Sequence, residues 1–166
     1  INSFQRPIFV PEGINTPILD NKINIHTTNI QSTKQVRSSL FFSKQKPIST
    51  QVKEYLTEIC KIHLDCMCKE FAERLGSRVH KITLRDTRSR WGSCSNDAKL
   101  MFSWRLVMAP EDVLAYVAAH EVAHLKHMNH SKDFWETVEY LFGPYKKERA
   151  WLKQNGSTLH RYKFES

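Results

Sequence analysis

The chain has 166 residues, of which 40% are hydrophobic and 25% are charged, a composition typical of one globular domain with a hydrophobic core. It has no apolar run long enough to span a membrane, and its four cysteines are too few for a disulfide framework, so we expect a cytoplasmic protein without a membrane partner. The formal net charge of +8 leaves nucleotides and nucleic acids open as partners without selecting either. Nothing in the composition sets the oligomeric state.

Residues 1–47 are interrupted by prolines and rich in asparagine and threonine, which predicts an irregular, β-containing N-terminal segment. Short strands are expected at residues 8–10 and 23–26, the second because Ile23 and Ile25 alternate with polar residues. We expect this segment to pack on a main domain that comprises residues 48–166.

A long helix is predicted between residues 49 and 76. Ser49 or Thr50 can cap its start, and Gly76 is a typical stop signal. Three cysteines lie in this helix, where Cys66 and Cys68 point in nearly opposite directions and cannot hold one ion, so we expect core thiols. The apolar positions recur at spacings of three and four: Val52, Tyr55, Leu56, Ile59, Ile62, Cys66, Phe71 and Leu75.

Two strands are predicted next, at residues 79–85 and 100–107, because apolar and polar residues alternate in both stretches. The intervening stretch is dense in small and turn-forming residues, and Asn96-Asp97 is the expected turn. We expect the two strands to pair through this loop.

Three helices are predicted in the remainder of the chain. Pro110 opens the first, and acidic residues in its first turn favour the helix dipole. The second begins at Ser131 and stops at Gly143-Pro144. The third is shorter, covers residues 145–155 and ends at Gly156.

The helix that opens at Pro110 carries the strongest functional signal. His120 and His124 lie on one face, about 6 Å apart along the axis, so both imidazoles can bind one zinc ion. Glu121 lies beside that face among alanines and valines, where a carboxylate without a partner or a function is costly. We therefore predict a single Zn²⁺, with Glu121 as the general base that takes a proton from a metal-activated water during hydrolysis.

A hydrolytic zinc site needs a third protein ligand and an open fourth position. His127 shares the helix face but lies about 10 Å along the axis from the first histidine, which is too far. A glutamate of the next helix, Glu136 or Glu139, could serve instead. We favour His130, because Asn129 readily ends a helix in the left-handed conformation and the chain would then fold back towards the metal.

Six motifs follow one another along the second part of the chain: Arg90-Trp91-Gly92-Ser93-Cys94-Ser95, Ser103–Pro110, Tyr116-Val117, His120–Lys126, Asn129-His130-Ser131 and Phe134-Trp135. Together they resemble the YgjP-like metallopeptidases, a group related to the SprT-like zinc proteases. The resemblance extends over residues 50–160 and is weaker over the first 47. It implies an α+β, zincin-like single domain, in which a small β-sheet packs against the metal-binding helix and flanking helices. It also implies zinc bound by three histidines and a catalytic Glu121.

The resemblance also implies a peptide or protein substrate, since zincin-type peptidases commonly bind one as an extra strand; here the predicted strand at 100–107 would receive it. Arg105, Trp104 and Arg90 are the candidate substrate-binding residues. The tryptophan can equally be a core residue, and either arginine can instead form an ion pair with Asp86 or Glu111.

Further aromatic residues are expected near the metal. Phe134 and Trp135 should pack the second helix against the metal helix and hold the turn that carries the third ligand. Three tyrosines are candidates for donating a hydrogen bond to the transition state, and the sequence selects none of them: Tyr116, Tyr140 and Tyr145.

Two alternative functions use the same metal helix. The activated water could attack a phosphoanhydride, and the basic character of the chain would suit a nucleotide substrate. A DNA-associated SprT-like protease is the other alternative, and strongly salt-dependent DNA binding would support it. A purely structural zinc site fits least well, because Glu121 would then have no function.

Overall fold

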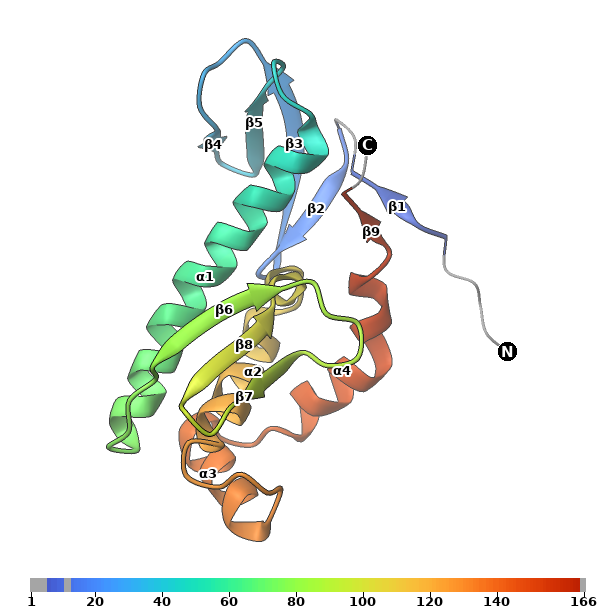
Figure 1. The fold of residues 1–166 in the computed structure, drawn as a ribbon. Coiled ribbons are helices and arrows are strands. Elements are labelled where there is room, and N and C mark those ends of the chain that lie inside the picture. Colours follow the sequence, from blue (N-terminus) through green and yellow to red (C-terminus); the bar gives the residue numbers. More distant parts are fainter. Residues whose placement is uncertain (1–5, 11–12, 165–166) are drawn as a thin grey trace.

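The computed structural model describes residues 6–10 and 13–164. Within these ranges the chain forms four α-helices, one 3₁₀ helix and nine short β-strands, which confirms the expected α+β class (Figure 1). The strands form a four-stranded, a three-stranded and a two-stranded sheet. Helix α1 (Ile48–Arg74) runs past the two larger sheets (Figure 1).

Helix α1 buries one face, as its apolar spacing predicts, but two members of the predicted stripe, Ile62 and Cys66, are exposed, so Cys66 is not the expected core thiol. It begins with Pro47 as N-cap and without a side-chain cap, so neither Ser49 nor Thr50 has the predicted capping role. Gly76 does end the helical region, because it adopts a φ of 63° and the following amide bonds back to the last turn. The apolar side chains that α1 buries recur every three or four positions: Val52, Leu56, Cys60, Leu64, Cys68 and Phe71.

Residues 15–43, which precede α1, form the four-stranded sheet. This sheet packs against the first turns of α1, where Phe42 meets Tyr55 edge to face and the Gln51 amide donates to the Ser43 carbonyl at 2.8 Å. Its strands, in the order β2-β3-β5-β4, are β2 (Asn15–Ile18), β3 (Asn21–Thr28), β5 (Ser39–Ser43) and β4 (Lys34–Val36).

The smallest sheet joins two strands that are far apart in the sequence. Strand β1 (Ile8–Phe9) pairs in parallel with β9 (Tyr162–Lys163). A boundary between two parts of the chain at residue 47 stays a prediction, and residues 1–5 and 11–12 of the N-terminal segment lie outside the described ranges.

The sheet beside α2 has three strands, β6 (Lys81–Arg85), β7 (Gly92–Cys94) and β8 (Lys99–Ser103). Strand β8 lies in the middle, parallel to β6 and antiparallel to β7. The two predicted strands therefore pair, and the loop between them contributes a third strand that the sequence analysis missed. Because β8 has a neighbour on each side, it offers no free edge.

Strand β8 is shorter than the stretch 100–107 predicted. After Ser103 the chain forms the 3₁₀ helix η1 (Trp104–Met108), so the prediction of a strand is wrong for this part. All five residues of η1 are buried, and the apparent alternation there does not mark a half-exposed strand. The Ser103 hydroxyl starts the turn by accepting a hydrogen bond from the Arg105 N–H at 3.3 Å.

Three helices complete the fold: α2 (Glu111–Ala123), α3 (Lys132–Phe142) and α4 (Lys146–Leu159). Helix α2 packs against α1, α3, α4 and β7. Helix α4 continues through Gly156, so this glycine is not the predicted stop. A Cβ at that position would come within 2.9 Å of the Trp91 indole, and close packing explains the glycine.

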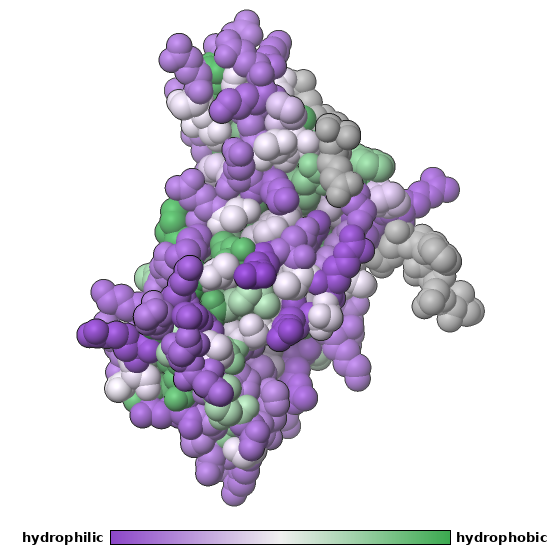
Figure 2. Space-filling model, viewed as in Figure 1, coloured by the Kyte–Doolittle hydropathy of each residue, from purple (hydrophilic) through white to green (hydrophobic). Residues whose placement is uncertain are grey.

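The core lies between α1, α2 and the three-stranded sheet, where Leu64, Phe102 and Leu114 are fully buried. The outer face of that sheet is mainly hydrophilic, with small apolar patches among the polar side chains (Figure 2). Within the described ranges, the helices include none that is both long and apolar enough to cross a membrane.

Candidate metal centre

Helix α2 presents His120 and His124 at its C-terminal end. The helix stops at Ala123 with His124 as C-cap, and the amides of residues 126 and 127 bond to the Ala123 carbonyl. The chain therefore leaves the helix about six residues before Asn129, and Asn129 is not in the left-handed conformation that the sequence analysis expected. The predicted reversal occurs, but a turn directly after the second histidine produces it.

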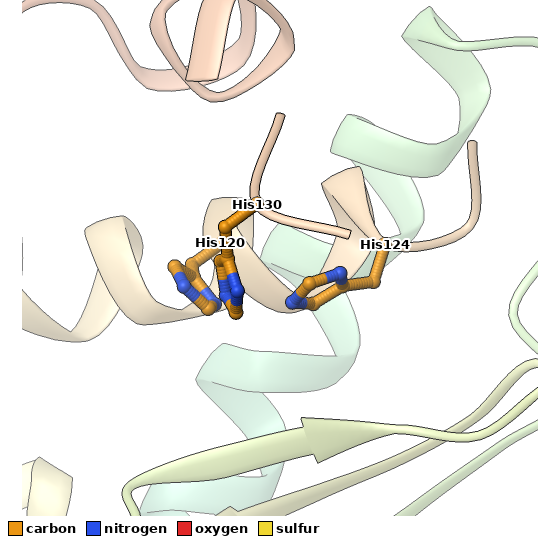
Figure 3. A group of neighbouring side chains, drawn as sticks. All are labelled: His120, His124 and His130. Carbon is orange, nitrogen blue, oxygen red and sulfur yellow. The ribbon is translucent and has the colours of Figure 1, made fainter. Parts of the chain in front are cut away.

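This turn brings His130 back to the histidines of α2. One nitrogen from each of His120, His124 and His130 lies within 4.8 Å of the other two, and Figure 3 shows the three imidazoles directed towards a common space. Nitrogens that bind one tetrahedral zinc lie about 3.3 Å apart, so small ring rotations suffice to bring them onto an ion. Among the described residues these three histidines are the one group with such spacing, and neither Glu136 nor Glu139 belongs to it.

Hydrogen bonds on the Nδ1 atoms orient the two histidines of α2. Nδ1 of His124 lies 2.9 Å from the His127 carbonyl oxygen, and Nδ1 of His120 lies 3.0 Å from Oε1 of Glu121. An acceptor at Nδ1 holds the proton there and leaves Nε2 with a free lone pair for a metal. His127 thus contributes through its carbonyl.

Phe134 of α3 packs against the rings of all three histidines. It is fully buried, and its ring centroid lies 5.1, 4.4 and 4.9 Å from those of His120, His124 and His130. Ser131 caps α3 by accepting a hydrogen bond from the Phe134 N–H at 3.2 Å, which fixes the residue next to His130. The predicted packing of the second helix against the first is confirmed.

The surroundings of His130 disfavour its protonated form. Partial burial, and then the proximity of His120 and His124, lower the pKa of His130 below its ordinary value. A neutral imidazole is the form that can donate a lone pair to a cation. The lowered pKa of His130 therefore suits a residue that binds a cation.

Glu121 is held against the sheet next to the histidines. It is only 4% exposed, and a Cβ placed on Gly92 of β7 would lie 2.8 Å from its Cγ. Gly92 therefore gives the Glu121 side chain the room it occupies. Gly92 lies in the Arg90–Ser95 motif, but no sequence signal predicts this role for it.

Strand β7 forms the edge of the sheet beside Glu121. The expectation that a substrate strand would pair with residues 100–107 is wrong, because β6 and β7 occupy both sides of β8. Cys94 of β7 is half-buried, and burial, followed by the charges of Glu121 and Asp97, raises its pKa to about 11. Its thiol is therefore neutral near pH 7, which makes it a poor nucleophile or ligand.

A stack of aromatic rings extends from the histidines to α4. Trp135 contacts the rings of His120 and His130, Tyr145 stacks on Trp135 at 5.1 Å, and Tyr116 stacks on Tyr145 at 5.9 Å. Burial raises the pKa of Tyr116 to about 12, so its hydroxyl stays protonated.

The third candidate, Tyr140, is 59% exposed and contacts Arg74 of α1. It has no described contact with the histidines, so the structure separates Tyr140 from the two tyrosines of the stack.

Arg105 and Trp104 are structural residues. The Arg105 side chain is 8% exposed, bonds to Asp86 at 2.8 and 3.2 Å, and donates to the carbonyls of Leu159 and Tyr162. The ion pair with Asp86 is one of the two that the sequence offered as alternatives to substrate binding by this arginine. Trp104 is 3% exposed and packs between Arg105 and the C-terminal residues, so it belongs to the core.

Arg90, the last candidate substrate-binding residue, is exposed in the loop before β7. Its backbone carbonyl accepts a hydrogen bond from the Thr87 hydroxyl. Its predicted contact with substrate stays a prediction.

Comparison with known proteins agrees with this geometry. The model of the YgjP-like metallopeptidase domain matches residues 11–155. No curated protein sequence matches the chain significantly. Two solved structures are similar in part. The metallopeptidase zymogen abylysin of Pyrococcus abyssi is 20% identical, with a TM-score of 0.49, and the match covers 60% of this chain and 97% of abylysin. The metallopeptidase zymogen jannalysin of Methanocaldococcus jannaschii is also 20% identical, with a TM-score of 0.46, and the match covers 57% of this chain and 96% of jannalysin. The family match spans most of the chain, and the chain therefore belongs to the YgjP-like metallopeptidases.

Proposed function

We propose that this metallopeptidase is zinc-dependent, with His120, His124 and His130 as the ligands of one ion and Glu121 as the general base. The observation that carries the proposal is the convergence of the three histidine nitrogens next to a buried carboxylate. A three-nitrogen site leaves a fourth position open, which is the arrangement of catalytic rather than structural zinc.

Each residue has a distinct task in this proposal. A zinc ion in such a site lowers the pKa of water and polarises a carbonyl group. Glu121 accepts the proton of the attacking water and delivers it to the amine that leaves, which a carboxylate beside the reacting atoms can do without changing position. The packing of Gly92 against Glu121 limits the motion of the carboxylate and excludes water from its far side.

The substrate is a peptide segment in extended conformation, paired with the free edge of β7. The exposed side of Gly92–Cys94 offers main-chain groups that hold an extended chain beside Glu121. The proposal also includes a cytoplasmic location. In its support, all four cysteines are free thiols, and Cys60 and Cys68 are buried in α1.

The test compares the wild-type chain with Glu121→Gln after loading with zinc. The variant should bind one zinc with unchanged affinity, and its kcat on a peptide library should fall by about 10²- to 10⁴-fold, because only the proton transfer is lost. Turnover of peptides by the variant at the wild-type rate would refute the general-base role. Hydrolysis of nucleoside triphosphates, with no peptide cleaved, would refute the peptidase function.

A further inference from the structure

The N-terminus of α4 concentrates positive charge beside the aromatic stack. Three of the first four residues of this helix are basic, Lys146, Lys147 and Arg149, and Tyr145 as N-cap provides no side-chain cap. The start of a helix is already the positive end of its dipole, so cations there are unfavourable. Glu148 is the one acidic residue of this turn, so the three cations outnumber it.

Arg149 is the member of this group that lies near the histidines. Its guanidinium carbon is 4.6 Å from the centre of the Trp135 ring. That ring in turn is 5.7 Å from the ring of His120 and 5.9 Å from the ring of His130. The guanidinium therefore lies within about 10 Å of the metal ligands, a distance that about three extended peptide residues span.

No carboxylate neutralises Arg149 within the described ranges. The structure gives it a cation–π contact with Trp135 but no ion pair and no side-chain hydrogen bond. Its neighbour Glu148 is turned inward, is 8% exposed, and leaves one carboxylate oxygen without a partner. Arg105 and Arg74, by contrast, donate to carboxylate or carbonyl oxygens. Arg149 is exposed, so its N–H groups remain available to an anion while the guanidinium lies over the Trp135 ring.

We propose that Arg149 and the first turn of α4 form a subsite for a carboxylate of the peptide substrate, within about three residues of the cleaved bond. The inference rests on the proposed peptidase function and adds a substrate class to it. A guanidinium can take a carboxylate through two parallel hydrogen bonds, and the uncapped amides at the helix start strengthen the attraction for an anion. The carboxylate belongs either to the C-terminus of a peptide or to an aspartate or glutamate side chain.

Binding without turnover tests the subsite separately from catalysis. Calorimetry with zinc-loaded Glu121→Gln compares peptides that differ only in a C-terminal carboxylate or amide, and a second pair that differs only in Glu or Gln at an internal position. In one of the two pairs the carboxylate peptide should bind about 10- to 100-fold more tightly, as expected for a charge-assisted bidentate contact. The pair that shows this preference identifies the source of the carboxylate.

When Arg149→Gln is combined with Glu121→Gln, the preference for the carboxylate peptide should disappear. Arg149→Lys in the same background should retain part of it, since the charge remains without the bidentate geometry. Arg78→Gln removes a positive charge from the exposed turn after α1 and should keep the full preference. Equal binding within both pairs, or a preference that survives Arg149→Gln in a variant with wild-type circular dichroism, would overturn the proposal. Hydrolysis by the wild-type chain is measured separately, so loss of peptidase activity and loss of the subsite remain distinguishable.

Discussion

Two hydrogen bonds determine how the histidines of α2 present their rings. The His127 carbonyl and the Glu121 carboxylate each lie next to an Nδ1 atom, and both leave Nε2 available. The sequence predicts His120, His124 and Glu121 from their spacing on one helix, and His130 only from an expected chain reversal at Asn129. It does not predict the role of the His127 carbonyl, because every residue has a carbonyl group. Only the turn after Ala123 directs this carbonyl towards Nδ1 of His124.

Gly92 gives the sharpest prediction for a single residue. In Gly92→Ala the new methyl group would meet the Glu121 side chain at 2.8 Å, so the carboxylate has to move. We expect kcat to fall by about 10- to 100-fold, as a displacement of a catalytic group by about 1 Å does, while zinc affinity stays near wild-type. Steady-state kinetics and zinc titration measure the two effects.

Gly156→Ala is the matched control for this variant. Its new methyl group would also meet a packed side chain, because it would lie 2.9 Å from the Trp91 ring, but the substituted residue is in α4. It should lower the melting temperature without the selective loss of kcat, since overpacking costs about 1–3 kcal/mol wherever it occurs. Equal losses of kcat in the two glycine variants would contradict the role given to Gly92.

The end of helix α2 and the start of helix α3 bring the three histidines together. The sequence predicts both starts, at Pro110 and Ser131, because proline and serine favour these positions for local reasons. It does not predict the end of α2, because His124 and the residues after it could continue a helix, and the turn is set by the packing of His130 on Phe134. The parallel pairing of β6 with β8 is likewise a tertiary property.

Removal of the N-cap of α3 should leave His130 less firmly positioned. Ser131→Ala loses the hydrogen bond to the Phe134 N–H and should lower the free energy of unfolding by about 1 kcal/mol. Because Ser131 adjoins His130, zinc affinity should fall more than in Ser157→Ala, a serine inside α4 with no such cap. Chemical denaturation and competition with a chromophoric chelator provide the two values. Zinc affinity equal in both variants would show that the cap does not support the site.

Across the whole molecule, Arg105 joins segments that are distant in sequence. Its guanidinium bonds to Asp86 after β6 and to carbonyls at the end of α4 and in β9. The sequence offered Asp86 as one partner but could not select it, and the carbonyl partners, more than fifty residues away, carry no sequence signal. The N-terminal sheet was also predicted only as irregular strands, since its order depends on pairing across loops.

The Asp86–Arg105 pair predicts a specific dependence of stability on pH. Burial alone would raise the pKa of Asp86, but the hydrogen bond and charge of Arg105 outweigh it and hold that pKa below the ordinary value. A carboxyl group with a lowered folded-state pKa stabilises the fold above its unfolded pKa of about 3.9, and this contribution is lost as the pH falls through the folded value.

Asp86→Asn should therefore be less stable than wild-type at pH 7, by about 1–2 kcal/mol for partly solvent-screened charge-assisted bonds. The difference should shrink as the pH falls below about 4, because the unfolded wild-type chain takes up a proton at Asp86 there, and it should vanish below the lowered folded-state pKa of Asp86. Urea denaturation at a series of pH values tests this. A difference that is constant down to pH 2 would mean that the charge of Asp86 does not contribute.

The zinc affinity of His130→Ala tests the central claim most directly, because His130 is the proposed ligand that reaches the other two histidines only where the chain folds back after α2. Zinc content and competition titration should give one ion per wild-type chain and a loss of affinity of at least about 10²-fold in the variant, since a catalytic zinc site holds its ion by three protein ligands. Glu139→Gln, which removes the alternative carboxylate on α3, should leave affinity unchanged. Wild-type affinity in His130→Ala together with a loss in Glu139→Gln would contradict the account.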